Sequence, residues 1–94
     1  VVTTSNSLDH TETDFKIMKE NDASVKDMEA GAIAWVCDLS STPFFALKVV
    51  TDIVDGDRPT HEEFLENLGA AAVSLQQTLP RVLDFITGKS LEEL

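Results

Sequence analysis

The strongest hydrophobic pattern lies in the last third of the chain. Apolar residues recur there three or four positions apart, at Phe64, Leu68, Ala71, Leu75, Leu79 and Val82. This spacing predicts one amphipathic helix that runs to about Thr87, after which an acidic tail should fray. Pro59, Thr60 and Glu63 come just before the pattern and predict a capping box at the start of the helix. Pro80 removes one backbone donor inside the helix, and we expect a kink or a break there.

Three segments have the composition of β-strands. Residues 1–4 form a short β-branched run before Ser5 and Asn6, which predicts a truncated strand that leaves a sheet. Residues 24–27 predict a short strand or an extended entry to the next helix. Residues 44–54 are nearly continuous in apolar side chains, which predicts a strand covered on both faces.

Two further segments have helical character. Residues 11–21 carry a weak apolar stripe, and either Asp9 or Thr11 can cap a helix there. Residues 28–39 repeat apolar side chains at the spacing of one helical face, which predicts a helix packed against a sheet. The positions of that face are Met28, Ala32, Ile33, Val36 and Leu39.

The alternation of strands and helices predicts an α/β fold, in which crossover helices join parallel strands. Two or three strands alone would leave unpaired backbone groups and a large apolar face. We therefore expect residues 1–94 to be one portion of a single larger domain. The chain begins with Val1 and not with methionine, which also favours a fragment or a processed product.

The net charge of the chain excludes some classes of binding partner. Seven basic and 17 acidic residues give a formal net charge of −10. Nucleic acids and anionic membrane surfaces would be repelled by this charge, so we predict neither as a partner. No apolar run has the length that a bilayer span requires. One cysteine, Cys37, lies in an apolar helical pattern, which predicts a buried thiol and fits a reducing, cytoplasmic compartment.

Asp52 is a candidate catalytic residue because it follows an apolar run at the predicted carboxyl end of a strand. Ligands of α/β sheets gather beyond such ends. Apolar neighbours would shield the carboxyl group, so it could keep its proton near neutral pH and donate it to a leaving group. Alternatively, Asp52 caps the following turn together with Asp55, Gly56 and Asp57. The residues alone leave both interpretations open.

Glu29 is a candidate binding residue in the first turn of a predicted helix, where the helix dipole favours a carboxylate. An ionised carboxylate accepts two hydrogen bonds at once, which matches the vicinal hydroxyls of a ribose. Met28 beside it offers a polarizable apolar surface for the flat side of a sugar. The alternative is that Glu29 only stabilises the start of the helix.

The segments KDMEAGAIAWV and FFALKVVTDIVDGD, in this order and spacing, resemble the C-terminal part of the plant-type 5'-methylthioadenosine nucleosidases. The resemblance covers essentially the whole chain. It implies the C-terminal part of a nucleoside phosphorylase-like three-layer α/β/α fold, without the N-terminal half of that domain. It also implies hydrolysis of the N-glycosidic bond of 5'-methylthioadenosine, with S-adenosylhomocysteine as a possible further substrate, which releases adenine in methionine salvage.

The resemblance implies roles for four residues. Glu29 would hold the ribose hydroxyls, and Met28 would pack on the sugar. Asp52 would protonate the purine at its N7, and Thr51 would support that aspartate. The two acidic side chains would thus act on opposite parts of one nucleoside.

The resemblance also places Leu8 and Asp9 against the adenine. Near them, Ser5 stands where the plant-type pattern TTGNS has glycine, and this change would remodel the base pocket if the glycine adopts an unusual backbone angle. Gly31 stands where alanine is common, which should cost about 1 kcal/mol of helix stability.

The resemblance implies no cofactor and a homodimer in the full-length protein. The water-activating glutamate of the family lies in the absent N-terminal half, so we expect the 94 residues alone to be inactive. The alternative is a non-catalytic nucleoside-binding or storage protein of the same fold. His10 and His61 lack companions at metal-ligand spacing, so we interpret them as surface histidines and predict no metal.

Overall fold

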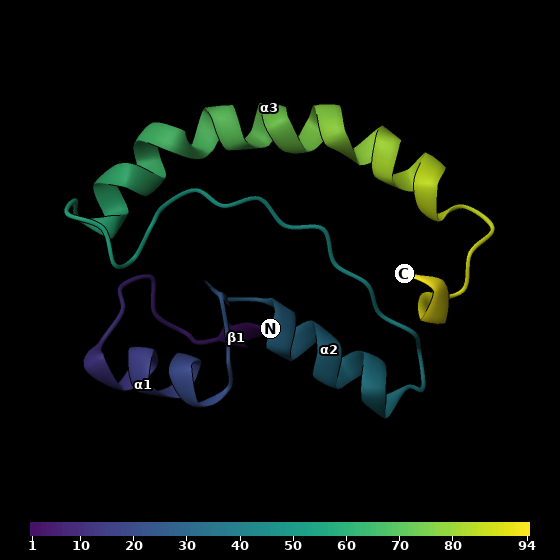
Figure 1. The fold of residues 1–94 in the computed structure, drawn as a ribbon, viewed down its shortest axis with the longest axis horizontal. Coiled ribbons are helices and arrows are strands. Elements are labelled where there is room, and N and C mark those ends of the chain that lie inside the picture. The colour runs from purple at the N-terminus through teal and green to yellow at the C-terminus, as the bar shows by residue number, and fades with distance from the viewer. The chain divides into compact units, whose positions relative to one another are not determined.

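The computed structural model describes all of residues 1–94 and divides into two compact units. The first unit is Val1–Phe44 and the second is Phe45–Leu94. Figure 1 shows both units as a ribbon and labels most of their elements. Each unit is described by itself below.

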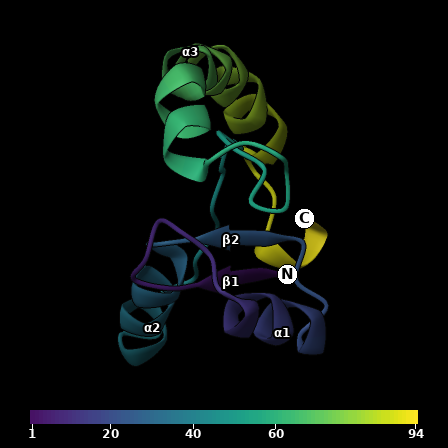
Figure 2. The same cartoon turned by 90° about the vertical axis from the view of Figure 1, so that its left-hand side faces the viewer.

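The first unit contains two strands and two helices in the order β1 (Val2–Thr4), α1 (Glu12–Glu20), β2 (Val25–Asp27) and α2 (Ala30–Leu39). The two strands pair in parallel and form a two-stranded sheet. Figure 2 shows them side by side, with α1 along one side of the sheet. A helix that joins two parallel strands is the crossover unit of α/β folds. The predicted strands at residues 1–4 and 24–27 are therefore confirmed.

The register of the sheet places the ends of both strands together. Val2 pairs with Val25, and Thr4 at the end of β1 pairs with Asp27 at the end of β2. One further backbone hydrogen bond extends the pairing, since the amide of Ser5 donates to the carbonyl of Asp27 over 3.0 Å. The loops after the two strands consequently leave from the same edge of the sheet.

Helix α1 begins at Thr11, one of the two caps that the sequence predicted, and a capping box forms there. The Asp14 amide donates to the Thr11 hydroxyl oxygen (3.2 Å), and the Thr11 amide donates to the Asp14 carboxylate (2.7 Å). These two bonds satisfy amides that would otherwise lack partners at the helix start. The Thr11 amide and hydroxyl lower the pKa of the Asp14 carboxyl. Thr11, and not Asp9, is the cap.

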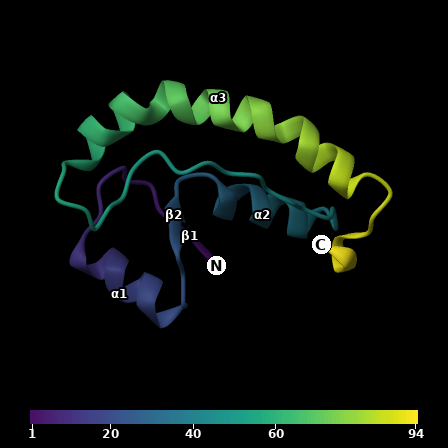
Figure 3. The ribbon, with the colours of Figure 1, turned by 45° about the horizontal axis from the view of Figure 1, so that its top comes forward.

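The second unit differs from the sequence-based expectation at residues 44–54. The segment has an extended backbone that runs alongside helix α3, Thr60–Ile86 (Figures 1 and 3), but it contains no strand. A strand requires a partner that accepts and donates backbone hydrogen bonds, and the structure holds one sheet, made of β1 and β2. The prediction of a strand there is wrong for this structure, because its apolar composition does not supply a partner.

Helix α3 (Thr60–Ile86) is the long helix that the periodicity predicts. The capping box predicted at its start is wrong: Pro59 is the N-cap residue, and no side-chain capping bond forms. Of the kink or break predicted at Pro80, the break does not occur, because the helix continues through the proline and is drawn as one curved ribbon in Figure 1. One proline removes one hydrogen bond, and the bonds on either side keep the helix continuous.

The acidic tail is more ordered than predicted. A short 3₁₀ helix, η1 (Leu91–Glu93), follows α3. The Ser90 amide donates to the Glu93 carboxylate over 2.6 Å in a second capping box. The Ser90 amide and hydroxyl lower the pKa of the Glu93 carboxyl. The predicted fraying is therefore wrong, since local polar bonds close a turn in the tail.

Very little of either unit is buried. Only Thr60 and Ala71 are buried, whereas large apolar side chains such as Trp35 and Leu39 of α2 are exposed. Cys37, which we expected to be buried, is half-buried. A large exposed apolar surface was the expected consequence of so few strands. No helix has both the length and the apolar character that crossing a membrane requires.

Candidate functional site

The candidate residues of the first unit follow the carboxyl ends of its two parallel strands. Leu8 and Asp9 lie in the loop after β1, and Met28 and Glu29 lie directly between β2 and α2. Because the strands are parallel and in register, both loops leave the same edge of the sheet. This edge is where α/β sheets bind ligands.

A hydrogen-bonded cluster fixes the segment that carries Met28 and Glu29. The Thr4 hydroxyl donates to the Asp27 carboxylate (2.5 Å) and accepts from the Gly31 amide (2.8 Å). The other Asp27 carboxylate oxygen accepts from the Ala30 amide (2.9 Å). The cluster thus ties the ends of both strands to the first turn of α2 (Thr4, Asp27, Ala30 and Gly31).

This cluster bears on the alternative interpretation of Glu29. Glu29 occupies the N-cap position of α2 but makes no side-chain capping hydrogen bond, whereas Asp27 does bond to a first-turn amide. The start of the helix is therefore stabilised by Asp27. Sequence reasoning missed this role of Asp27, although an acidic residue three positions before a first-turn amide is a recognisable capping signal.

Lys26 of β2 holds the loop that carries Leu8 and Asp9. Its ammonium group donates to the main-chain carbonyls of Ser7 (2.5 Å) and Asp9 (3.3 Å). The Ser7 hydroxyl also donates to the Asp9 carbonyl (3.2 Å). The loop is thus attached to the strand that leads to Met28. Lys26 was not among the residues singled out from the sequence.

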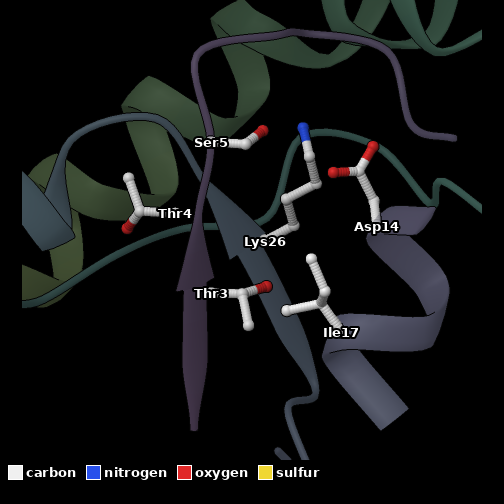
Figure 4. A pocket seen from close by; sticks show the side chains of 6 residues that line it. All are labelled: Thr3, Thr4, Ser5, Asp14, Ile17 and Lys26. Carbon is white, nitrogen blue, oxygen red and sulfur yellow. The ribbon is translucent and has the colours of Figure 1, made fainter. Parts of the chain in front are cut away.

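A small pocket lies between α1 and the sheet. Its volume is about 90 Å³. Figure 4 shows the residues that line it: Thr3, Thr4, Ser5, Asp14, Ile17 and Lys26. Ligand pockets for small molecules usually measure about 300 to 1,000 Å³, so this pocket is too small for a nucleoside. None of the candidate residues of the first unit lines it.

Two departures from the plant-type pattern lie next to this region. Ser5 does not have a positive φ, so the backbone there adopts no angle that needs glycine. Gly31 lies close to β1, because a Cβ atom added to it would meet the Thr4 Cβ at 3.0 Å. Glycine at position 31 therefore permits the close approach of α2 to β1.

The two histidines differ in their surroundings. His61 is exposed, as predicted, but His10 is half-buried against the Phe15 ring, with ring centroids 4.7 Å apart. The Nδ1 atom of His10 is buried without a hydrogen-bond partner. The interpretation of His10 as a surface histidine is therefore wrong, because its ring packs on an aromatic neighbour. No group of three or more His, Cys, Asp or Glu side chains has an arrangement suited to a metal ion.

In the second unit, Asp52 is half-buried and its carboxylate accepts a 2.6 Å hydrogen bond from the Thr51 hydroxyl. The following turn is closed by a backbone bond, in which the Gly56 amide donates to the Ile53 carbonyl over 3.1 Å. The Asp52 side chain takes no part in that bond.

Two side chains of α3 bond to the main chain on either side of Asp52. The Asn67 amide group donates to the Thr51 carbonyl (2.9 Å), and the Ile53 amide donates to the Glu63 carboxylate (3.2 Å). Glu63, predicted to cap α3, contacts this segment instead. Sequence reasoning missed both roles, because nothing local signals a contact across 10 or 16 positions of the chain.

The chain was compared with protein families and with known proteins. The model of the phosphorylase superfamily matches residues 1–84. A 5'-methylthioadenosine/S-adenosylhomocysteine nucleosidase of Arabidopsis thaliana is 50% identical over 99% of this chain, and a 5'-methylthioadenosine nucleosidase of the same plant is 46% identical. The chain spans 37% and 35% of the lengths of these two relatives.

Solved structures agree with this match. The apo structure of the Arabidopsis thaliana 5'-methylthioadenosine nucleosidase superposes with a TM-score of 0.89 at 46% identity, over 99% of this chain and 38% of that one. A crystal structure of an MTA/SAH nucleosidase superposes with a TM-score of 0.88 at 49% identity, over the same shares. The predicted α/β class, as part of a nucleoside phosphorylase-like fold, is confirmed. The chain belongs to the phosphorylase superfamily.

Proposed function

We propose that the protein that carries this chain hydrolyses the N-glycosidic bond of 5'-methylthioadenosine and releases adenine, with S-adenosylhomocysteine as a second substrate. The observation that carries the proposal is the match of 99% of the chain, at 46 to 50% identity, to proteins named as nucleosidases for these compounds. The retention of Met28, Glu29, Thr51 and Asp52 in one pattern supports it.

The proposed chemistry assigns Asp52 as the acid. It donates a proton to N7 of adenine, so the electrons of the breaking glycosidic bond move into a neutral leaving group. Thr51 supports Asp52 through the hydrogen bond between their side chains. The oxygen of a water molecule bonds to the sugar carbon, the water-activating glutamate expected in the N-terminal half takes up one proton of that water, and the products are adenine and methylthioribose. A protonated leaving group lowers the barrier in the same way as in glycoside hydrolysis.

The remaining residues bind the substrate. Glu29 accepts hydrogen bonds from the two ribose hydroxyls, and Met28 packs on the sugar. Leu8 and Asp9 contact the adenine from the loop that Lys26 holds. The position of both segments at the carboxyl edge of parallel strands supports these assignments. No cofactor takes part in this scheme.

The proposal includes a cellular location and an oligomeric state. We propose that the reaction serves methionine salvage in the cytoplasm, where a single free thiol fits the reducing conditions. We also propose a homodimer, in which exposed apolar side chains such as Trp35 of α2 contribute to the contact. Light scattering of the full-length protein would detect a dimer, and a monomer would contradict this part.

Adenine release measures the proposed activity. The natural polypeptide that carries these 94 residues, at its full encoded length, should release adenine from 5'-methylthioadenosine equally fast with and without phosphate. A requirement for phosphate, with a sugar 1-phosphate as product, would make it a phosphorylase. Tight nucleoside binding without turnover would instead favour the non-catalytic binding or storage protein. The 94 residues alone should release no adenine.

A further inference from the structure

We propose that Asn67 and Glu63 are positioning residues for the acid Asp52, a proposal that rests on the function given above. The two residues lie four positions apart on α3 and therefore on one face of that helix. They bond to the main chain immediately before and immediately after Asp52. Both side chains are half-buried.

Two backbone groups beside Asp52 obtain their hydrogen bonds from side chains of α3. The side-chain amide of Asn67 donates a hydrogen bond to the Thr51 carbonyl, and the Glu63 carboxylate accepts one from the Ile53 amide. These two contacts form a brace that fixes the two peptide groups that flank the Cα atom of Asp52.

The brace and the Thr51 hydroxyl act on the same carboxyl group. Because the Thr51 hydroxyl donates to Oδ1 of Asp52, the transferred proton resides on Oδ2. Asn67 holds the carbonyl of the same threonine, so one residue of α3 sets the backbone position of Thr51 while the threonine side chain orients the acid. A misplacement of about 1 Å in a catalytic group can cost about 10²-fold in rate.

The test uses Asn67→Ala in the full-length protein, with Gln77→Ala as control. Gln77 is an exposed amide on the same helix, so the control matches the change in side-chain type. We expect Asn67→Ala to lower kcat for 5'-methylthioadenosine about 10- to 100-fold, with KM within about twofold, because the acid acts in the transition state. Gln77→Ala should leave kcat unchanged.

A second substrate separates positioning from general damage to the fold. A nitrophenyl glycoside of the same sugar has a leaving group that needs no proton, so Asn67→Ala should hydrolyse it at the rate of the unaltered protein. Equal losses on both substrates would overturn the proposal. So would an Asn67→Ala variant as active on 5'-methylthioadenosine as Gln77→Ala.

A measurement without turnover tests the Glu63 contact. Hydrogen exchange at the Ile53 amide should be faster in Glu63→Ala than in Glu62→Ala, its exposed neighbour, and should recover in Glu63→Gln, which keeps an acceptor oxygen. Exchange equal in all three variants would overturn the brace. If the unaltered protein released no adenine, the proposed function would fail, and the exchange result would still decide whether the brace exists.

Discussion

Glu29 and Asp52 are both candidate site residues, but the chain holds the two segments that carry them in different ways. Glu29 follows a strand with a paired backbone, and the cluster of Thr4 and Asp27 closes around the start of its helix. Asp52 lies between two peptide groups that the Asn67 and Glu63 side chains of α3 hold. The first arrangement comes from neighbouring strands and caps, and the second depends on single side chains.

The difference implies unequal tolerance to mutation. A backbone ladder persists when one side chain changes, because its bonds are made by main-chain groups. A segment braced by side chains loses a bond with each substitution. Substitutions that remove one group at a time from each unit therefore test this difference.

The largest effect should come from the acid of the second unit. We expect Asp52→Asn to lower kcat about 10²- to 10⁴-fold in the full-length protein, because an amide cannot donate the proton that the purine accepts. Asp55→Asn, an exposed carboxyl three residues further on, is the matched control and should retain activity. Steady-state adenine release measures both, and equal activity of the two variants would remove Asp52 from the mechanism.

The corresponding change in the first unit is Asp27→Ala. It removes the acceptor for the Ala30 amide and the partner of the Thr4 hydroxyl. The free energy of unfolding should therefore fall by about 1 kcal/mol, as it does when other helix caps are removed. Because Met28 and Glu29 lie at this start, we expect KM for the nucleoside to rise more than kcat falls. Thermal unfolding and kinetics check the two effects.

The control for Asp27→Ala is Asp38→Ala, which removes an exposed carboxyl late in the same helix. A second variant, Asp27→Asn, keeps an acceptor oxygen and should retain most of the stability that Asp27→Ala loses. If Asp27→Ala and Asp38→Ala behaved alike, the cluster would contribute nothing to holding Glu29.

A smaller effect concerns the pH dependence of the first unit. Hydrogen bonds from Thr11 lower the pKa of Asp14 in the folded chain. The stability they contribute is therefore present above the ordinary pKa of an aspartate and is lost as the pH falls through the lowered, folded value. Thermal midpoints measured down this acidic range should fall less steeply in Asp14→Asn. An unchanged slope would show that the capping box does not couple to protonation.

Sequence reasoning found most of the elements that have clear local patterns, the short strands β1 and β2 among them. The cap at Thr11 and the long period of α3 depend on residues within a few positions, and both were predicted. The strand at residues 44–54 was predicted wrongly because strand formation needs a partner that no local pattern specifies. The contact of Asn67 with Thr51 was missed for the same reason, since it joins residues 16 positions apart.

In the candidate site, too, some residues were predicted from local sequence and others were missed. The pattern around Met28 and Glu29 pointed to the carboxyl edge of the sheet, and the paired strands place it there. Lys26, which holds the loop with Asp9, was missed because a lysine in a short strand gives no signal of the carbonyls it will bond. The roles assigned to all six site residues remain predictions: Leu8, Asp9, Met28, Glu29, Thr51 and Asp52.

The smallest effects compare a glycine from each unit. Replacement of glycine by alanine inside a helix usually gains about 1 kcal/mol, because alanine loses less backbone entropy on folding. Gly69 of α3 has nothing within 4 Å of an added Cβ, so Gly69→Ala should give nearly the whole gain. At Gly31 the added Cβ would lie 3.0 Å from the Thr4 Cβ, which is attached directly to a strand and cannot swing aside.

We therefore expect Gly31→Ala to change the unfolding free energy by less than about 0.5 kcal/mol, because the gain in helix propensity and the crowding against β1 oppose each other. The difference between the two glycine variants, measured by denaturant unfolding, isolates the cost of that crowding. A full gain at position 31 would mean that β1 shifts freely and that the strand end is not held by the cluster around Asp27. The paired backbone of the first unit would then be no more restrictive than the side-chain brace of the second.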